Sequence, residues 1–225
     1  MKKVITFLVL LFLIGSIFAQ APVKRNANSQ TFPTNKKVTS PRLQKTTRSG
    51  YVNGHMAVDL GLSVRWADCN IGANCKEDDG RFFAYGRPDG KIGDGANSFA
   101  NICKTEHDMA SKNWGGSWRL PTKKEMQELL AKCSWKMTSI NGIKGYIVKA
   151  SNGNSIFLPL SGYSSPNGER YDYGKAGAYW IGELVTETWA YGAGYPLQLD
   201  PERKQKPSLG IMDPNNGCSV RAVTE

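Results

Sequence analysis

Tyrosine residues are concentrated in the second half of the chain, among glycine, asparagine and aspartate residues. A tyrosine ring presents a flat apolar face and a polar edge, and few rotatable bonds are frozen when it binds a ligand. Such rings on loops suit the recognition of sugars or of protein surfaces. We take four as candidate ligand-binding residues: Tyr171, Tyr173, Tyr191 and Tyr195. The alternative for each ring is burial in an irregular core, where most aromatic side chains lie.

Two aspartates, Asp89 and Asp94, lie in the glycine-rich segment PDGKIGDG at residues 88–95. Carboxylate and backbone carbonyl oxygens are the ligands that hard cations prefer, so the pair is a candidate calcium site. The spacing does not match a known calcium loop, and solvated surface aspartates are the alternative. The two histidines, His55 and His107, lack the spacing of a zinc site, and no other cofactor is indicated.

The chain contains five cysteines: Cys69, Cys75, Cys103, Cys133 and Cys218. An odd number leaves at least one thiol free or paired outside the chain. Cys75 and Cys103 both lie in polar, loop-like sequence, so we predict a disulfide between them. Cys133 falls on an apolar helical stripe and is predicted to be a small buried side chain.

Residues for catalysis do not form a recognisable set. Nucleophilic hydrolysis needs a serine, a histidine and a carboxylate in mutually supporting positions, and neither histidine has an evident partner in the sequence. The acidic pairs Asp78–Asp79 and Glu183 with Glu187 are more typical of solvated surface than of a glycosidase centre. The sequence therefore predicts a protein without catalysis of its own.

Residues 1–19 have the pattern of a secretory signal peptide. A basic start is followed by an apolar run at 4–18 and by small residues at Ala19 and Ala21. The run is shorter than the roughly 20 residues that span a bilayer, although a retained anchor is the alternative. No cysteine lies near the cleavage point, which argues against a lipoprotein. We expect an exported protein that does not span the membrane after cleavage and resides in the periplasm, on the cell surface or outside the cell.

Residues 20–50 are predicted to be a flexible basic linker. The chain has a formal net charge of +10, and this segment contains many of its basic residues and no acid, whereas all 19 acidic residues follow from Tyr51 onward. Few apolar residues are present to offset the entropy of ordering. A solvated spacer is the favoured interpretation of this linker, and contact with an anionic envelope surface is the alternative. Because charges nearly balance in 51–225, a nucleic-acid partner is not expected.

One helix is strongly predicted, from Thr122 to Cys133. Thr122 suits the N-cap, and Glu125 three residues later completes a capping box. Apolar residues then recur at helical spacing, from Met126 through Leu129 to Cys133, and form one stripe that faces a core. The helix gives the surrounding loops a fixed support.

Several short strands complete the expected domain at residues 51–225. Asn141-Gly142 and Asn152-Gly153 supply the positive φ angles of type I′ turns on either side of the run at 145–150. Further strands are predicted at 82–85 and at the closing run 219–223. One long helix with short antiparallel strands and long loops indicates an α+β domain.

Several segments resemble a known family in the same order along the chain. They are AVDLGLSVRWADCNIGA (57–73), DDGRFFAYG (78–86), WGGSWRLPTKKEMQELL (114–130), CSWKM (133–137), GNSIFLPLSGY (153–163) and SVRAV (219–223). Together they resemble the Fibrobacter succinogenes major paralogous domain, common in surface and secreted proteins of Bacteroidetes-type bacteria. The segment at 119–125 is also similar to formylglycine-generating enzymes.

Both resemblances imply a C-type-lectin-like fold: a small, mostly antiparallel sheet, about two helices and long irregular loops. In such a fold, Trp114 and Trp118 would dock the helix onto the sheet and brace the loops, while Arg119 would bind a carboxylate or loop carbonyls. The enzyme family also implies a reactive cysteine pair late in the chain, where this sequence has Cys218 alone.

The sequence thus favours an exported binding module for carbohydrate or protein ligands at the cell envelope. A structural or assembly subunit of a surface complex or pilus is the alternative. An oxidase-type enzyme related to formylglycine-generating enzymes is the least favoured.

Overall fold

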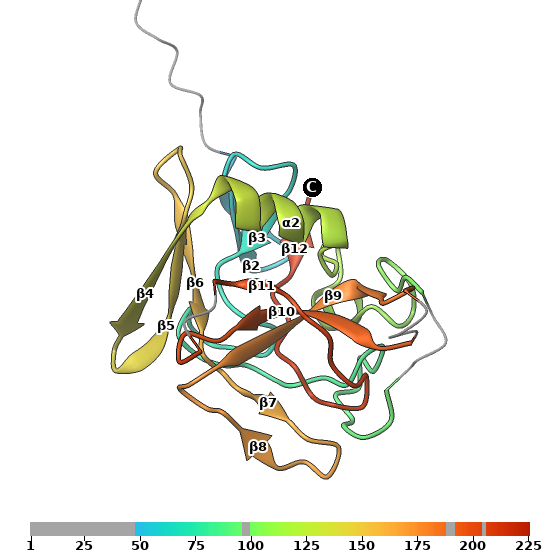
Figure 1. Ribbon diagram of the computed structural model, residues 1–225. Helices are drawn as coiled ribbons and strands as arrows, with labels where there is room; N and C mark the ends of the chain where they lie inside the picture. The colour runs from blue at the N-terminus through green and yellow to red at the C-terminus, as the bar shows by residue number, and fades with distance from the viewer. Residues whose placement is uncertain (1–47, 96–99, 188–191, 204–205) are drawn as a thin grey trace, which may run out of the picture. The chain divides into compact units, whose positions relative to one another are not determined.

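The computed structural model describes residues 48–95, 100–187, 192–203 and 206–225. Over these residues the chain forms two helices and four small antiparallel sheets (Figure 1), so the predicted α+β class is confirmed. The predicted signal peptide, and the predicted linker up to residue 47, lie outside the described residues. Neither helix in the described part is long and apolar enough to cross a membrane.

The first sheet joins the start of the domain to its end. Its strand order is β1-β2-β3-β12, with the bounds β1 Gly50–Val52, β2 His55–Val58, β3 Arg65–Ala67 and β12 Val223–Thr224. The backbone N–H of Arg48 donates to Asp59 Oδ2 at 2.9 Å. The folded domain therefore begins ahead of the boundary predicted at residue 51.

The second sheet is a regular meander of β4, β5 and β6, with the bounds Ser134–Ile140, Ile143–Lys149 and Ser155–Pro159. Asn141 and Gly142 have φ angles of 49° and 83°, which confirms the type I′ turn between β4 and β5. In the second turn Gly153 has a positive φ of 92° but Asn152 does not, and Ala150 N donates to Asn154 O at 2.9 Å. The type I′ prediction for Asn152-Gly153 is therefore wrong.

The third sheet has the order β11-β10-β9, and a two-stranded ribbon of β7 and β8 lies outside it. The bounds are β7 Tyr163–Ser164, β8 Arg170–Tyr171, β9 Gly177–Leu184, β10 Gly194–Leu199 and β11 Ser208–Leu209. The predicted strand at 82–85 is reduced to a single bridge between Phe83 and Cys218. The run at 219–223 forms an isolated bridge between Ser219 and Tyr179 and becomes a strand only at Val223. Long-range partners, more than local sequence, decide the lengths of these strands.

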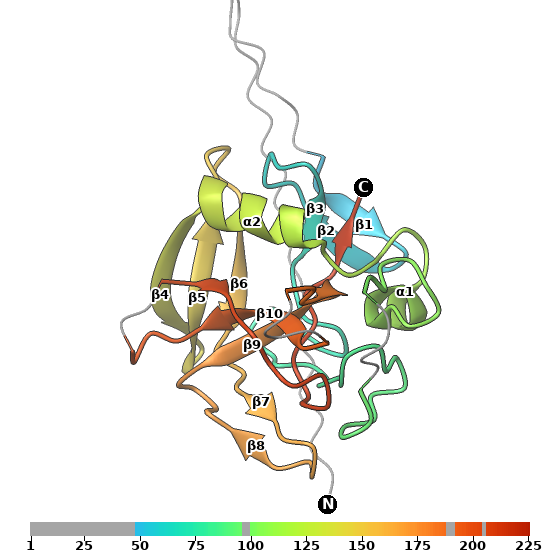
Figure 2. The same cartoon turned by 45° about the vertical axis from the view of Figure 1, so that its right-hand side comes forward.

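The two helices are α1, Met109–Trp114, and α2, Lys123–Lys132 (Figure 2). In α2 the predicted capping box is confirmed, because Thr122 Oγ1 accepts from Glu125 N at 3.2 Å and Glu125 Oε2 accepts from Thr122 N at 2.8 Å. The α1 helix was not predicted. Its N-cap is Asp108, whose carboxylate accepts from the N–H groups of Ala110 and Ser111.

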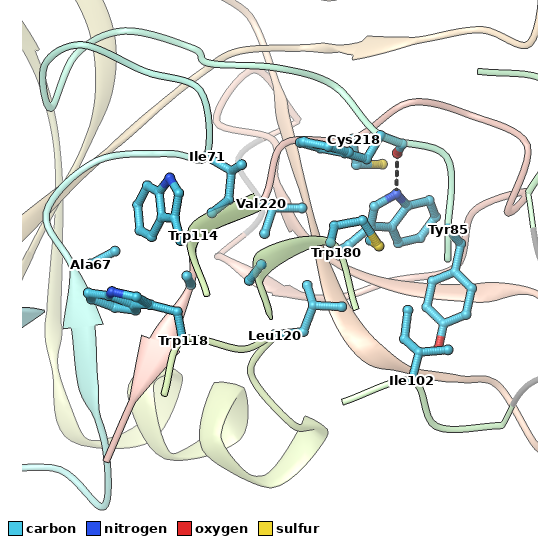
Figure 3. Packing of buried hydrophobic residues seen from close by; sticks show 14 of the residues in the cluster. Ala67, Ile71, Tyr85, Ile102, Trp114, Trp118, Leu120, Trp180, Cys218 and Val220 are labelled. Atoms are coloured by element: carbon cyan, nitrogen blue, oxygen red, sulfur yellow. Dashed lines mark hydrogen bonds between the residues drawn. The ribbon is translucent and has the colours of Figure 1, made fainter. Parts of the chain in front are cut away.

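Buried side chains form two apolar clusters. The first contains Trp114, Trp118 and Trp180 (Figure 3), and the second contains Met126 and Leu129 of α2. The tryptophan corner is therefore core packing, as predicted, but it braces α1 and the loops and does not dock the apolar stripe of α2.

Candidate functional site

Exposed aromatic rings gather on the β7–β8 ribbon. Tyr163 and Tyr171 are cross-strand partners, and their rings stack with centroids 5.6 Å apart. Tyr171 is 42% exposed and Tyr173, two residues on, is 50% exposed. We call Tyr163, Tyr171 and Tyr173 the tyrosine platform. Tyr163 is half-buried against the first apolar cluster, so the pair places an exposed ring on an anchored one. Since large apolar rings are usually buried, the exposed ring of Tyr171 marks a surface suited to a ligand.

Arg170 holds the tyrosine platform in place. Its guanidinium lies 4.1 Å from the ring centroid of Tyr173 and 5.1 Å from that of Phe82. It also pairs with Asp79 at 2.5 Å and donates to Ser161 O at 2.9 Å. Tyr173 therefore stacks on a fixed cation, which limits the positions its ring can take.

The hydroxyl of Tyr171 is also fixed. It donates to Glu169 Oε2 at 2.6 Å, and this hydrogen bond raises the pKa of Tyr171 and lowers that of Glu169. The polar edge of the ring is thereby occupied within the ribbon. What remains available to a ligand is chiefly the ring face.

A groove of about 380 Å³ adjoins the platform, with Tyr163 in its wall. Carboxylates, amides and one guanidinium supply its polar lining: Asp172, Asp200, Asp213, Gln198, Asn216 and Arg203. Arg203 pairs with Asp200 at 3.1 Å, so the remaining two carboxylates leave the groove acidic. Oxygen acceptors beside an aromatic wall can bind hydroxyl groups while apolar C–H groups contact the ring. We call this hollow the acidic groove.

The four predicted tyrosines do not form one site. Tyr171 and Tyr173 belong to the platform. Tyr195, in β10, instead directs its side chain to the first residue of α2: its hydroxyl is 3.1 Å from Lys123 Nζ and 3.1 Å from Glu187 Oε1. Tyr191 lies outside the described residues. Tyr195 is thus occupied by intramolecular partners at a different place on the fold.

Sequence reasoning missed Tyr163, Arg170 and the acids of the groove. The one local signal was Asn167-Gly168, a turn dipeptide that closes the β7–β8 ribbon, with Gly168 at a φ of 88°. It would have placed Tyr163 and Tyr171 on paired strands. The groove acids come from distant segments, and no local pattern joins them.

The predicted calcium residues are paired with an arginine. Arg87 contacts Asp89 at 3.2 Å and Asp94 at 2.8 Å, in the wall of a hollow of about 550 Å³. A cation at these carboxylates would have to displace the guanidinium. Elsewhere in the described residues, no three histidine, cysteine or carboxylate side chains are grouped to hold a metal ion.

The predicted disulfide between Cys75 and Cys103 is absent, and all five cysteines are free. Cys75 is exposed, whereas Cys103 packs so closely on β9 that a Cβ added at Gly182 would lie 2.1 Å from its sulfur. Burial is the main cause that raises the pKa of Cys103 to about 12. Its thiol is therefore protonated and unreactive at neutral pH.

The corner at 114–125 acts as a structural support. Trp118 Nε1 donates to Val52 O at 2.8 Å, and Trp114 stacks on His55 with ring centroids 3.8 Å apart. Arg119 binds a carboxylate, as predicted, since its guanidinium contacts Glu125 at 2.6 Å.

No family model matches the chain, and no curated protein or solved structure matches it either. The family resemblance and the lectin-like fold that it implies therefore stay predictions.

Proposed function

We propose that this protein is an exported, non-catalytic module of C-type-lectin-like fold that binds carbohydrate at the bacterial cell envelope. The observation that carries the proposal is the stack of the exposed Tyr171 ring on the half-buried Tyr163 ring, which lies in the wall of the acidic groove. Ring faces contact the C–H groups of a sugar, and carboxylate and amide oxygens accept hydrogen bonds from its hydroxyls. A groove of about 380 Å³ falls within the usual range of ligand sites.

The charge of the groove indicates which sugars it accepts. Asp172 and Asp213 have no cationic side chain paired with them among the ion pairs of the described residues, whereas Asp200 is paired with Arg203. Uronic acids and sialic acids would be repelled by these carboxylates. Neutral sugars and amino sugars are therefore the ligands that the groove suits.

The test is a glycan screen with the full chain lacking residues 1–19, in calcium and in chelator. We expect binding to neutral or amino-sugar polysaccharides. Tyr171→Ala should weaken it at least about tenfold, and Tyr51→Ala, which removes a 74% exposed ring in β1, should leave it intact. Equal binding by both variants would contradict the site. Loss in chelator would support a calcium role for Asp89 and Asp94, despite their pairing with Arg87.

An assembly subunit is the second candidate, favoured by an unpaired strand edge described below. A screen without any bound glycan would favour this candidate or a protein ligand for the platform. The basic linker is proposed to contact an anionic envelope surface, and a nucleic-acid partner is not proposed. Oxidase chemistry is the least favoured, because Cys218 is buried and its pKa is raised well above the usual value by burial.

A further inference from the structure

The outer edge of β4 carries backbone groups that no described segment pairs. The order of the second sheet is β4-β5-β6, so β4 has one strand neighbour and lies at the margin of the sheet (Figure 1). All seven residues of β4 pair with β5 in unbroken register, without a bulge. A long regular edge of this kind is a template for a further strand.

The β4–β5 turn determines which groups point outward. In a hairpin with a two-residue type I′ turn, the two residues that flank the turn exchange backbone hydrogen bonds. Here they are Ile140 and Ile143. Hydrogen-bonded pairs alternate along an antiparallel ladder, so every second residue of β4, counted back from Ile140, directs its N–H and C=O groups toward β5. Lys144 agrees with this phase, because its carbonyl accepts from Leu160 N, on the side away from β4. The outward N–H and C=O groups of β4 are therefore those of Trp135, Met137 and Ser139.

These outward groups are symmetric about Met137. We propose that two copies of this chain pair through β4, antiparallel, across a two-fold axis at Met137. This register places Met137 opposite its own copy and Trp135 opposite Ser139, and each of these pairs exchanges two hydrogen bonds. The product is one continuous sheet in the order β6-β5-β4-β4-β5-β6. The inference does not depend on carbohydrate binding.

Side chains on the edge are compatible with self-pairing. Met137 is 39% exposed, which is unusual for a large apolar side chain, and it would be covered at the axis. Lys136 is the one charged residue of β4, and it would face Thr138 of the second copy, so no like charges are directly opposed. Pairing through one strand buries less accessible surface than the roughly 1,200–2,000 Å² that stable protein interfaces bury, so we expect a weak dimer.

The first test is the mass of the full chain lacking residues 1–19, measured by light scattering over a wide range of concentration. We expect the mass to rise from one chain to two. Met137→Pro should stay monomeric, because it removes an outward N–H without removing a β4–β5 hydrogen bond. Met137→Lys keeps the N–H but opposes two ammonium groups at the axis, and should also stay monomeric. Tyr51→Ala, an exposed apolar change in β1, should dimerise like the wild type.

A second test locates the axis. Directly paired residues have Cα atoms about 5.5 Å apart, within the roughly 4.4–6.8 Å range of disulfides. Met137→Cys should therefore give a covalent dimer on mild oxidation, faster than the wild type or Tyr51→Cys. A wild type that stays monomeric at every concentration would overturn the proposal, as would dimerisation of folded Met137→Pro and Met137→Lys. Loss of glycan binding in these variants is not expected, so the two proposals can fail separately.

Discussion

Arg119 and Glu125 form a two-pronged ion pair, with N–O distances of 2.8 and 2.6 Å between side chains that are 8% and 12% exposed. The same carboxylate accepts from Thr122 N and so completes the capping box of α2. One side chain therefore ties the loop before α2 to the first turn of the helix. This shared role makes Glu125 a sensitive position for stability.

Glu125→Gln should destabilise the fold by roughly 3 kcal/mol, because it removes the buried carboxylate of the pair and leaves only the exposed Glu225, 3.7 Å from Arg119 Nε, as a counter-charge to the guanidinium. Glutamine keeps an acceptor for the capping box, so Glu125→Ala should cost about 1 kcal/mol more. The measurement is urea unfolding at neutral pH. Lys104→Gln, which breaks the exposed pair of Lys104 and Glu225, is the control and should have no measurable effect. Equal stability of Glu125→Gln and wild type would contradict the role of the pair.

The stabilisation from Glu125 should disappear in acid. Burial opposes ionisation of this carboxyl, but hydrogen bonds from Arg119 and Thr122 outweigh burial and lower its pKa below 4.5. Because the carboxyl is more acidic in the folded protein than in the unfolded chain, its contribution is present above pH 4.5 and is lost as the pH falls through the folded-state pKa. Melting temperatures of wild type and Glu125→Gln should therefore converge in that range. A difference in melting temperature that stays constant with pH would contradict the role given to the ionised Glu125 carboxylate.

Arg221 should be the most sensitive residue of the closing segment. It is 1% exposed, and its guanidinium donates to Asn70 Oδ1, to Phe157 O and to the carbonyls of Ala67 and Asp68. Arg221→Met would leave these buried acceptors unsatisfied.

The expected loss for Arg221→Met is more than about 4 kcal/mol, in the exceptional range for one substitution. Arg65→Met is the matched control, because the hydrogen bonds of Arg65 lie at the surface, and it should cost less than about 1 kcal/mol. Chemical unfolding of both variants provides the comparison. Similar losses for the two would show that the carbonyl partners of Arg221 contribute little.

Features set by neighbouring residues could be predicted from the sequence. The capping box of Thr122 and Glu125 lies within one turn of helix, and the Asn141-Gly142 turn needs only its own φ angles. Both predictions were correct because local hydrogen bonds determine these structures. The Asn152-Gly153 turn has the same dipeptide but a different geometry, which shows that tertiary context can override even this strong local signal.

Features set by distant residues could not be predicted. Cys103 lies in polar sequence, yet it is partly buried because β9 brings Gly182 against it. Tyr195 and Tyr171 have similar surroundings in the sequence, but one contacts Lys123 and the other joins the platform. The candidate site depends on such long-range contacts, so only two of its residues, Tyr171 and Tyr173, were anticipated.

Gly162 should be required for the geometry of the platform. Its φ is 71°, and a Cβ there would lie 2.0 Å from Tyr171 O, so an alanine would push β8 away. Gly168 has a similar φ of 88° but open space around it. Gly168→Ala should therefore cost only the strain of a left-handed residue, about 1–2 kcal/mol. Gly162→Ala should cost more and should also weaken glycan binding, as measured by unfolding and by titration. Equal losses of stability and of binding in the two variants would show that the contact between the new Cβ at position 162 and Tyr171 O is relieved without a cost in free energy.

The ring face of Tyr171, more than its hydroxyl, should determine affinity for glycan. The hydroxyl already donates to Glu169, so Tyr171→Phe loses an internal hydrogen bond but keeps the stack on Tyr163. We expect Tyr171→Phe to bind within a few-fold of wild type. Tyr171→Ala should weaken binding at least about tenfold, which corresponds to about 1.4 kcal/mol. Calorimetric titration with the glycan found in the screen separates the two. Equal loss in both variants would instead assign recognition to the hydroxyl, and full binding by Tyr171→Ala would remove the platform from the site.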